Sequence, residues 1–170
     1  LKGGSFRVYA KKNNNKALIS KTNSNEIKKI LLKEKKQGFS SLGAVKKYNK
    51  IYALEKIKTE NFIKKLLLKD KMFAYGASAG STSMIYFYNL KKSISFLVDD
   101  NKLRVNLYAP GSKIKILKLS KILSHNPKYT ILLAWRYRDQ ILSKNKKYIE
   151  NGGKFISLYP KIEIIEWNIC

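Results

Sequence analysis

Short apolar runs alternate with helical patterns through the second half of this sequence. Four runs have the length and composition of buried strands, namely KMFAYG at 71–76, SISFLVDD at 93–100, KYTILLAW at 128–135 and KFISLYP at 154–160. Helix-like stretches stand between them at 80–90, 120–125 and 137–153. This alternation constrains the fold most, because parallel strands need a crossover connection, usually a helix.

Two further segments complete the pattern. The irregular stretch 101–117 ends in a short strand, and KIEIIEW at 161–167 alternates like a strand. The sequence therefore predicts an α/β fold, a Rossmann-like and mostly parallel sheet with flanking helices.

In the first part of the chain the apolar residues are spaced differently. SFRVYA at 5–10 reads as a strand, and residues 24–36 have helical spacing. A longer helical stretch at 42–68 reads either as two helices or as one helix kinked near residues 58–60. We expect a strand-and-helix appendage at 1–69, followed by a Rossmann-like domain at 70–170.

A net charge of +25 raises the question of nucleic-acid binding. Only four of the 36 basic residues are arginine, the residue that dominates base-edge and bidentate phosphate recognition. The lysines are spread along the whole chain together with asparagine and isoleucine, the residues that AT-rich codons supply. We expect a solvated lysine surface and neither nucleic acid nor a membrane as partner. The apolar runs are far shorter than the about 20 residues of a membrane-spanning helix.

The cysteine and histidine content limits the chemistry. The one cysteine, Cys170, permits no internal disulfide and no cysteine zinc site, so we expect no metal and a reducing, cytoplasmic setting. The one histidine, His125, stands in a loop-like SHNPKY segment, where an exposed residue is more common than a general base. We expect no catalytic residue in this chain. Because the sequence opens on Leu1 directly before a strand, we expect a piece of a longer protein.

The stretch FAYGASAGSTSM at 73–84 puts eight small, uncharged residues at the first strand-to-helix turn. Ligands bind at this edge of parallel sheets, with anions at the helix N-terminus. Gly76 would form the turn, and Asp99, 23 positions later, is near the spacing at which an acidic residue holds a ribose. The pattern is not G-x-G-x-x-G, so close helix–sheet packing and a dinucleotide site are both alternatives. The donors offered to a ligand would come from Ala77, Ser78, Ser81, Thr82 and Ser83.

The same residues resemble a known family. YGASAGSTSMIYFY resembles G-Y-G-A-S-A-R-S-S-T-L-L-N-Y in the C-terminal domain of S-adenosylmethionine-dependent C-methyltransferases that act on nucleotide-linked deoxysugars. VDDNKLRVNLYAPGSKI resembles V-D-x-N-P-x-K-Q-G-x-Y-x-P-G-T-x-I, and ILLAWRYRDQI resembles L-L-A-W-N-F-x-x-E-I. YIENGGKFISLYP resembles Y-x-x-x-G-G-x-F-I-x-P-x-P, and GGSFRVYA at 3–10 resembles G-G-S-[FLI]-R-x-[YF]. Five blocks in the same order make the resemblance specific.

The resemblance implies that the chain is the substrate-binding portion of such an enzyme. Family members also carry a cysteine-rich zinc region and a central domain that binds S-adenosylmethionine, with the catalytic His and Tyr after it. This sequence contains none of those segments and no Glu-x-Gly-x-Gly loop. The methyl donor would therefore be bound by a separate domain, in cis or in trans, and this chain alone would be inactive. The implied substrate-binding residues are Gly76, Ala77, Ser78, Ser81, Ser83, Asp99, Trp135, Arg136, Ser5 and Arg7.

Several of these residues also have a structural interpretation. Asp99 holds a sugar hydroxyl or caps the turn after its strand. Trp135 stacks on a base or sugar, or it covers the core. Arg7 reaches a ligand or pairs with a carboxylate, and Tyr108 borders the pocket or belongs to a rigid turn. At the level of the whole chain, the alternative is a stand-alone nucleotide- or dinucleotide-binding module without catalysis.

The sequence departs from the family pattern at five positions. These are Lys2 for His or Asn, Gly80 for Arg, Tyr86 for Asn, Lys102 for Pro and Arg136 for Asn. The loss of Arg at position 80 and the gain of Arg136 would move one phosphate-binding charge across the pocket.

Overall fold

The computed structural model describes residues 21–39, 41–67 and 72–166. The chain divides into two compact units, Leu1–Glu55 and Lys56–Cys170. This division falls earlier than the domain boundary expected between residues 69 and 70, which stays a prediction. The expected strand at 5–10, with Ser5 and Arg7, lies outside the described residues.

The first unit contains helix α1 (Lys21–Lys36) and the start of helix α2 (Leu42–Leu66). The Ser41 hydroxyl accepts a hydrogen bond from the Ala44 N–H at 3.1 Å and so caps the start of α2. Because α2 continues without a break past residue 60, residues Leu42–Leu66 form one helix and not two. Among the described side chains up to Glu55, none is buried.

The second unit is built on a six-stranded sheet with the order β3-β2-β1-β4-β5-β6. Its first five strands are parallel, and β6 is antiparallel to β5. This is the strand order of a Rossmann-like doubly wound sheet. The prediction of an α/β, mostly parallel fold is confirmed. The strands are β1 (Met72–Tyr75), β2 (Ile94–Asp99), β3 (Ile116–Lys118), β4 (Tyr129–Leu132), β5 (Lys154–Ser157) and β6 (Glu163–Ile165).

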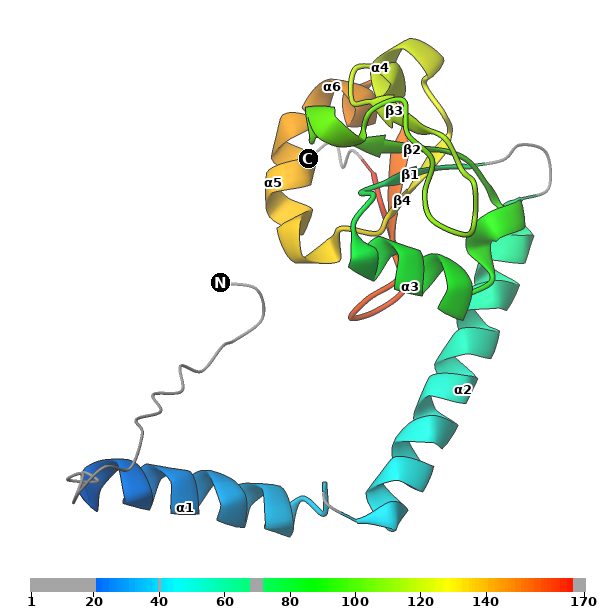
Figure 1. Ribbon diagram of the computed structural model, residues 1–170. Helices are drawn as coiled ribbons and strands as arrows, with labels where there is room; N and C mark the ends of the chain where they lie inside the picture. The colour runs from blue at the N-terminus through cyan, green and yellow to red at the C-terminus, as the bar shows by residue number, and fades with distance from the viewer. Residues whose placement is uncertain (1–20, 40, 68–71, 167–170) are drawn as a thin grey trace. The chain divides into compact units, whose positions relative to one another are not determined.

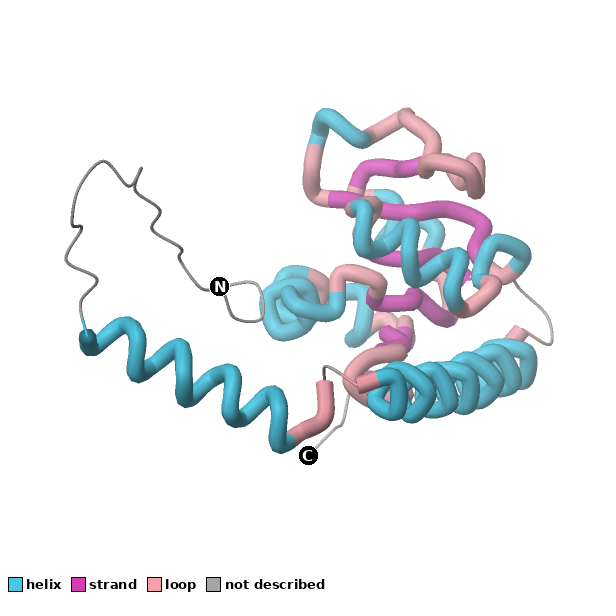
Figure 2. The backbone as a smooth tube through the Cα atoms, turned by 60° about the horizontal axis from the view of Figure 1, so that its bottom comes forward, coloured by secondary structure: helices cyan, strands magenta, loops and turns pink. Residues whose placement is uncertain are grey.

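Helices connect these strands and cover both faces of the sheet (Figures 1 and 2). The predicted helix at 137–153 is divided into two short helices at Asn145. The Asn145 side chain bends back and donates to the Ile141 carbonyl at 2.7 Å. The elements are α3 (Ala79–Phe87), α4 (Lys121–His125), α5 (Arg138–Lys144) and α6 (Lys146–Glu150), with 3-10 turns η1 (Leu90–Lys92), η2 (Lys102–Arg104) and η3 (Trp135–Tyr137).

Strand β1 shows how the core is divided between the two faces. Met72 and Ala74 pack on one face with side chains of α3 and the last turns of α2. Phe73 and Tyr75 pack on the other face with side chains of α4, α5 and α6. All four residues of β1 are buried, as expected for a central parallel strand covered on both sides.

The Gly-Gly pair after α6 has a packing explanation. Gly152 has a φ of +84°, which favours glycine. A Cβ on Gly153 would overlap the fully buried ring of Tyr148. The Tyr148 hydroxyl donates to the Pro127 carbonyl at 2.8 Å, and burial raises the pKa of Tyr148 to about 12. These glycines therefore serve the fold.

Candidate functional site

The turn after β1 lies at the carboxyl edge of the sheet, where the strand order reverses. Strand β1 has β2 on one side and β4 on the other. The crevice at such a reversal is where α/β folds bind ligands. The predicted residues Gly76, Asp99 and Trp135 follow or end β1, β2 and β4 respectively, so the fold brings them to one edge.

Gly76 is required by its surroundings within the protein. Its φ is +103°, and a Cβ at this position would stand 2.8 Å from the Cβ of Ala134. The Tyr75 carbonyl accepts the N–H groups of Leu133 and Ala134 at 3.0 and 3.1 Å, which holds the turn after β4 against this point. At Gly76, Ala134 in the turn after β4 fills the space that a side chain would occupy.

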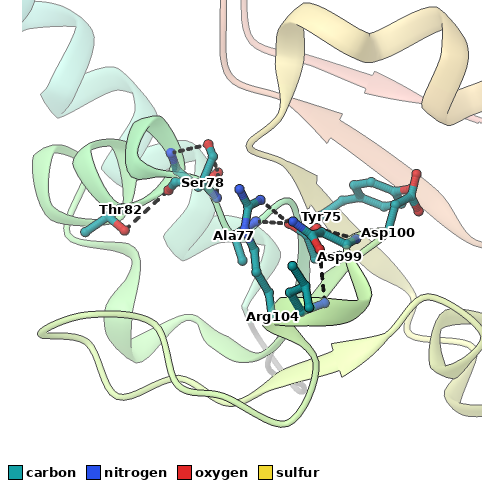
Figure 3. Close-up of polar contacts among 10 residues, drawn as sticks. Tyr75, Ala77, Ser78, Thr82, Asp99, Asp100 and Arg104 are labelled. Carbon is teal, nitrogen blue, oxygen red and sulfur yellow. Dashed lines mark hydrogen bonds and ion pairs between the residues drawn. The ribbon is translucent and has the colours of Figure 1, made fainter.

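Ser78 and Ser81 form a capping box at the start of α3 (Figure 3). The Ser81 N–H donates to the Ser78 hydroxyl and the Ser78 N–H to the Ser81 hydroxyl, both at 3.3 Å. Capping boxes satisfy N–H groups that the helix itself leaves unpaired. Thr82 and Ser83 bond back to helix carbonyls at 3.4 and 3.3 Å. All four hydroxyls thus have partners within the turn or helix.

Two backbone N–H groups at the start of α3 are not satisfied by the capping box. Ala79 and Gly80 are exposed, and within the described parts of the chain their N–H groups have no hydrogen-bond partner. Free N–H groups in the first turn of a helix carry a partial positive charge. A Cβ on Gly80 would meet only the Ser78 hydroxyl, at 3.7 Å, so the space beside this residue is open.

Asp99 forms hydrogen bonds with both the turn after β1 and the turn after β2 (Figure 3). It is 7% exposed. Its Oδ2 atom accepts the Ala77 N–H at 2.7 Å and the Arg104 guanidinium at 3.2 Å, and its Oδ1 atom accepts the Asn101 N–H at 2.8 Å. Asp99 thus caps the turn after its strand, one of the two roles expected for it. Within the described residues Oδ1 accepts one hydrogen bond, which leaves part of its acceptor capacity unused.

A second polar group at this edge was not predicted. The Tyr75 hydroxyl donates to Asp100 Oδ1 at 2.7 Å, and the Lys144 ammonium donates to Asp100 Oδ2 at 2.9 Å. Burial and the bond to Asp100 raise the pKa of Tyr75. Partial burial opposes ionisation of Asp100, but the bonds from Tyr75 and Lys144 outweigh it and lower the pKa of this carboxyl. The two consecutive acidic residues at the strand end were the signal for this group.

Trp135 and Arg136 form a separate contact after β4. The Trp135 and Tyr159 rings lie 4.5 Å apart, and the Arg136 guanidinium lies 5.0 Å above the Trp135 ring. Arg136 is exposed and Trp135 half-buried. Among the described residues, no hydrogen bond or ion pair joins these two side chains to the turn at Gly76.

Tyr108 belongs to a turn at residues 108–111 that is held by backbone pairing and by a glycine. Tyr108 pairs with Lys115 in an isolated antiparallel bridge. Gly111 has a φ of +68°, and a Cβ there would overlap the Tyr86 hydroxyl. Tyr86, which departs from the family pattern, therefore packs over this turn.

Three further features are His125, the possible metal ligands and the length of the helices. His125 is the last residue of α4 rather than a loop residue, and it is exposed beside the rings of Phe73 and Phe96. In residues 21–39, 41–67 and 72–166, His, Cys, Asp and Glu form no cluster of three or more suited to a metal ion. None of the helices in these ranges is both long and apolar enough to span a membrane.

Comparison with known proteins assigns the family. The model of the C-methyltransferase C-terminal domain matches residues 1–160. The C-methyltransferase NovU of Streptomyces niveus is 34% identical over 92 residues, which are 54% of this chain and 22% of NovU. A crystal structure of UDP-D-quinovosamine 4-dehydrogenase from Vibrio fischeri has a TM-score of 0.43 and 14% identity, over 59% of this chain and 95% of that one. The family match covers more than nine tenths of the sequence, so the chain belongs to the C-methyltransferase C-terminal domain family.

Proposed function

We propose that this chain is the substrate-binding portion of an S-adenosylmethionine-dependent C-methyltransferase and that it binds a nucleotide-linked sugar. The family supports a methyltransferase. The observation that carries the binding site is the open start of α3 at the carboxyl edge, where the Ala79 and Gly80 N–H groups are exposed and without a partner among the described residues. An anion is the ligand that such a helix start favours.

The residues of the turn have distinct roles in this proposal. The Ala79 and Gly80 N–H groups bind the anionic part of the nucleotide sugar. The Ser78–Ser81 capping box fixes the start of the helix. Asp99 holds the Ala77 N–H in place and offers its remaining Oδ1 capacity to a sugar hydroxyl. Ser83, Trp135 and Arg136, together with Ser5 and Arg7 outside the described residues, would contact other parts of the ligand.

S-adenosylmethionine supplies the methyl group in this proposal, and a separate domain binds it, in cis or in trans. The sequence contains no Glu-x-Gly-x-Gly loop of the kind that binds this cofactor in the family. We therefore assign no chemical step to this chain, whose residues bind and orient the sugar. That the chain covers only 22% of NovU agrees with a donor-binding part elsewhere.

The proposal is tested by titrating the labelled chain in solution. The probes are the uridine, thymidine, guanosine and adenosine diphosphate esters of glucose, and the amide signals are read by NMR. Addition of a bound nucleotide sugar should shift the signals of Ala77, Ala79 and Gly80, whereas S-adenosylmethionine should shift none and donate no methyl group. Shifts confined to another edge of the sheet, or micromolar binding of S-adenosylmethionine, would contradict it.

A further inference from the structure

Arg104 occupies a different position from the other described arginines. Arg138 pairs with Glu163 at 2.8 Å, and Arg136 lies over the Trp135 ring. Arg104 pairs at 3.2 Å with Asp99, a carboxylate that also accepts the Ala77 N–H in the turn after β1. The positive charge of Arg104 therefore lies beside the turn after β1.

The backbone around Arg104 is fixed by a short chain of hydrogen bonds. Asp99 Oδ1 accepts the Asn101 N–H, and the Asn101 side chain in turn accepts the Leu103 N–H at 3.0 Å. The Arg104 N–H donates to the Asn101 carbonyl at 2.9 Å. These bonds fix the backbone of η2 directly after β2. They therefore also fix the position of the Arg104 Cα atom, from which the side chain extends.

The Arg104 guanidinium is paired with Asp99, and the Arg104 side chain is partly exposed. The Asp99 side chain is 9% exposed, whereas that of Arg104 is 41% exposed. A guanidinium has five N–H donors, and within the described chain a single hydrogen bond of Arg104 to a side chain is present. Its planar fork matches the oxygens of a phosphate. Figure 3 shows the Arg104 side chain reaching Asp99 beside Ala77, at the turn after β1.

We propose that Arg104 binds a phosphate group of the ligand at this edge and that Asp99 is the positioning residue that orients its guanidinium. The inference rests on the proposed function and names the cation of that site. It assigns the phosphate charge to Arg104, not to Arg136, whose guanidinium lies over Trp135. The ligand class is a phosphate or diphosphate ester.

The test compares Arg104→Met and Arg104→Lys with the unchanged chain. Affinities are measured by NMR titration for the four nucleoside diphosphate glucoses, for inorganic pyrophosphate and for the free nucleosides. Arg104→Met should weaken binding of every phosphate-bearing probe roughly 10- to 100-fold, the range for a hydrogen bond to a charged group. It should leave the nucleosides unchanged. Arg104→Lys keeps the charge but not the planar guanidinium. Its affinity for the phosphate-bearing probes should lie between those of Arg104→Met and the unchanged chain.

Two controls separate binding from folding. Lys146→Met removes an exposed charge from α6, and Lys146 has no ion pair in the part of the chain that the structure describes. Asp99→Asn combined with Arg104→Met removes both charges, so no buried carboxylate is left unpaired. The double variant should fold and still have a weakened affinity for the phosphate-bearing probes. Lys146→Met should bind these probes as tightly as the unchanged chain does.

The outcomes distinguish this inference from the proposed function. If a nucleoside diphosphate glucose binds equally well to Arg104→Met and to the unchanged chain, the inference is wrong and the proposed function stands. If pyrophosphate binds in an Arg104-dependent manner and no nucleotide sugar binds, the inference stands and the proposed function is wrong. If no phosphate-bearing probe binds the unchanged chain, both are wrong.

Discussion

Gly76 and Gly80 stand four residues apart at the start of α3 but meet different surroundings. Gly76 combines a φ of +103° with the close approach of Ala134, whereas Gly80 has open space beside it. The family resemblance includes Gly76 among the substrate-binding residues, whereas Gly80 stands where the family pattern has Arg. At the residue scale the structure assigns Gly76 to packing and leaves Gly80 at the open start of the helix.

Alanine substitutions should separate these two roles. Gly76→Ala should cost about 1–3 kcal/mol of stability, because the new Cβ clashes with Ala134 and the φ is unfavourable. Gly80→Ala should be neutral or stabilise by up to about 1 kcal/mol, because alanine is preferred in helices. Urea unfolding of both variants provides the measurement. A Gly76→Ala variant as stable as the unchanged chain would contradict the packing role.

The Tyr75–Asp100–Lys144 group predicts a pH dependence of stability. The pKa of Asp100 is lowered below its usual 3.8, so folding favours the charged carboxylate. Its contribution is therefore present above pH 3.8 and is lost as the pH falls through the folded pKa. Asp100→Asn should lower the melting temperature near neutral pH, and the difference should disappear in strong acid.

The effect should be small, since the Asp100 side chain is 41% exposed and solvent screens the charge. The control is Asp139→Asn in the first turn of α5, an exposed carboxylate that forms no ion pair within the described residues. A melting-temperature difference for Asp100→Asn that stays constant from neutral pH to strong acid would contradict the assignment.

At the scale of elements, the strands and most helices were predictable because each has its own periodic pattern. The break between α5 and α6 was not, since YRDQILSKNKKYIENGG carries one uninterrupted helical pattern. At the break the buried Asn145 side chain donates to the Ile141 carbonyl. A local pattern does not show whether such a polar residue turns inward.

The candidate site was predictable in position but only partly in contacts. The composition around Gly76 marked the turn, and Asp99 was identified from its spacing. Arg104 was missed as a partner of Asp99, and so was the bond between Lys144 and Asp100, which are 44 residues apart in sequence. The Lys144–Asp100 pairing depends on the tertiary fold and the Arg104–Asp99 pairing on the η2 turn after β2, and no sequence motif encodes either of them.

Helix α2 has isoleucine side chains that differ strongly in burial along its length. Ile63, near its end, is 2% exposed in the core cluster, whereas Ile51, earlier in the same helix, is 42% exposed. Ile63→Ala should cost about 2–5 kcal/mol through the lost burial and the cavity. Ile51→Ala should change stability by less than about 0.5 kcal/mol. Equal losses measured by thermal unfolding would contradict the placement of the core at the end of α2.

At the scale of the whole molecule, the net charge of +25 predicts weak and sequence-blind binding to nucleic acid. Lysines spread along the chain attract phosphates without reading bases. Binding to duplex DNA should therefore be measurable at low salt and vanish near about 0.15 M salt, where exposed charges are screened. Fluorescence anisotropy with two unrelated duplexes provides the measurement. A tight complex with one duplex at that salt would contradict the interpretation of the lysines as solvated surface.

The central claim is that the open start of α3 receives the anionic part of a nucleotide sugar. Gly80→Glu tests it most directly, because the residue is exposed and a side chain fits there. A negative charge in the first turn of a helix also favours the fold. Gly80→Gln is the matched control, with the same size and no charge.

The decisive measurement is the affinity of both variants for the nucleoside diphosphate glucose that binds the unchanged chain best, with melting temperatures taken on the same samples. Gly80→Glu should bind it at least about tenfold more weakly than Gly80→Gln, equivalent to about 1.4 kcal/mol, with no loss of melting temperature. Equal affinities in the two variants would show that the ligand's charge does not lie at this helix start and would contradict the proposed site.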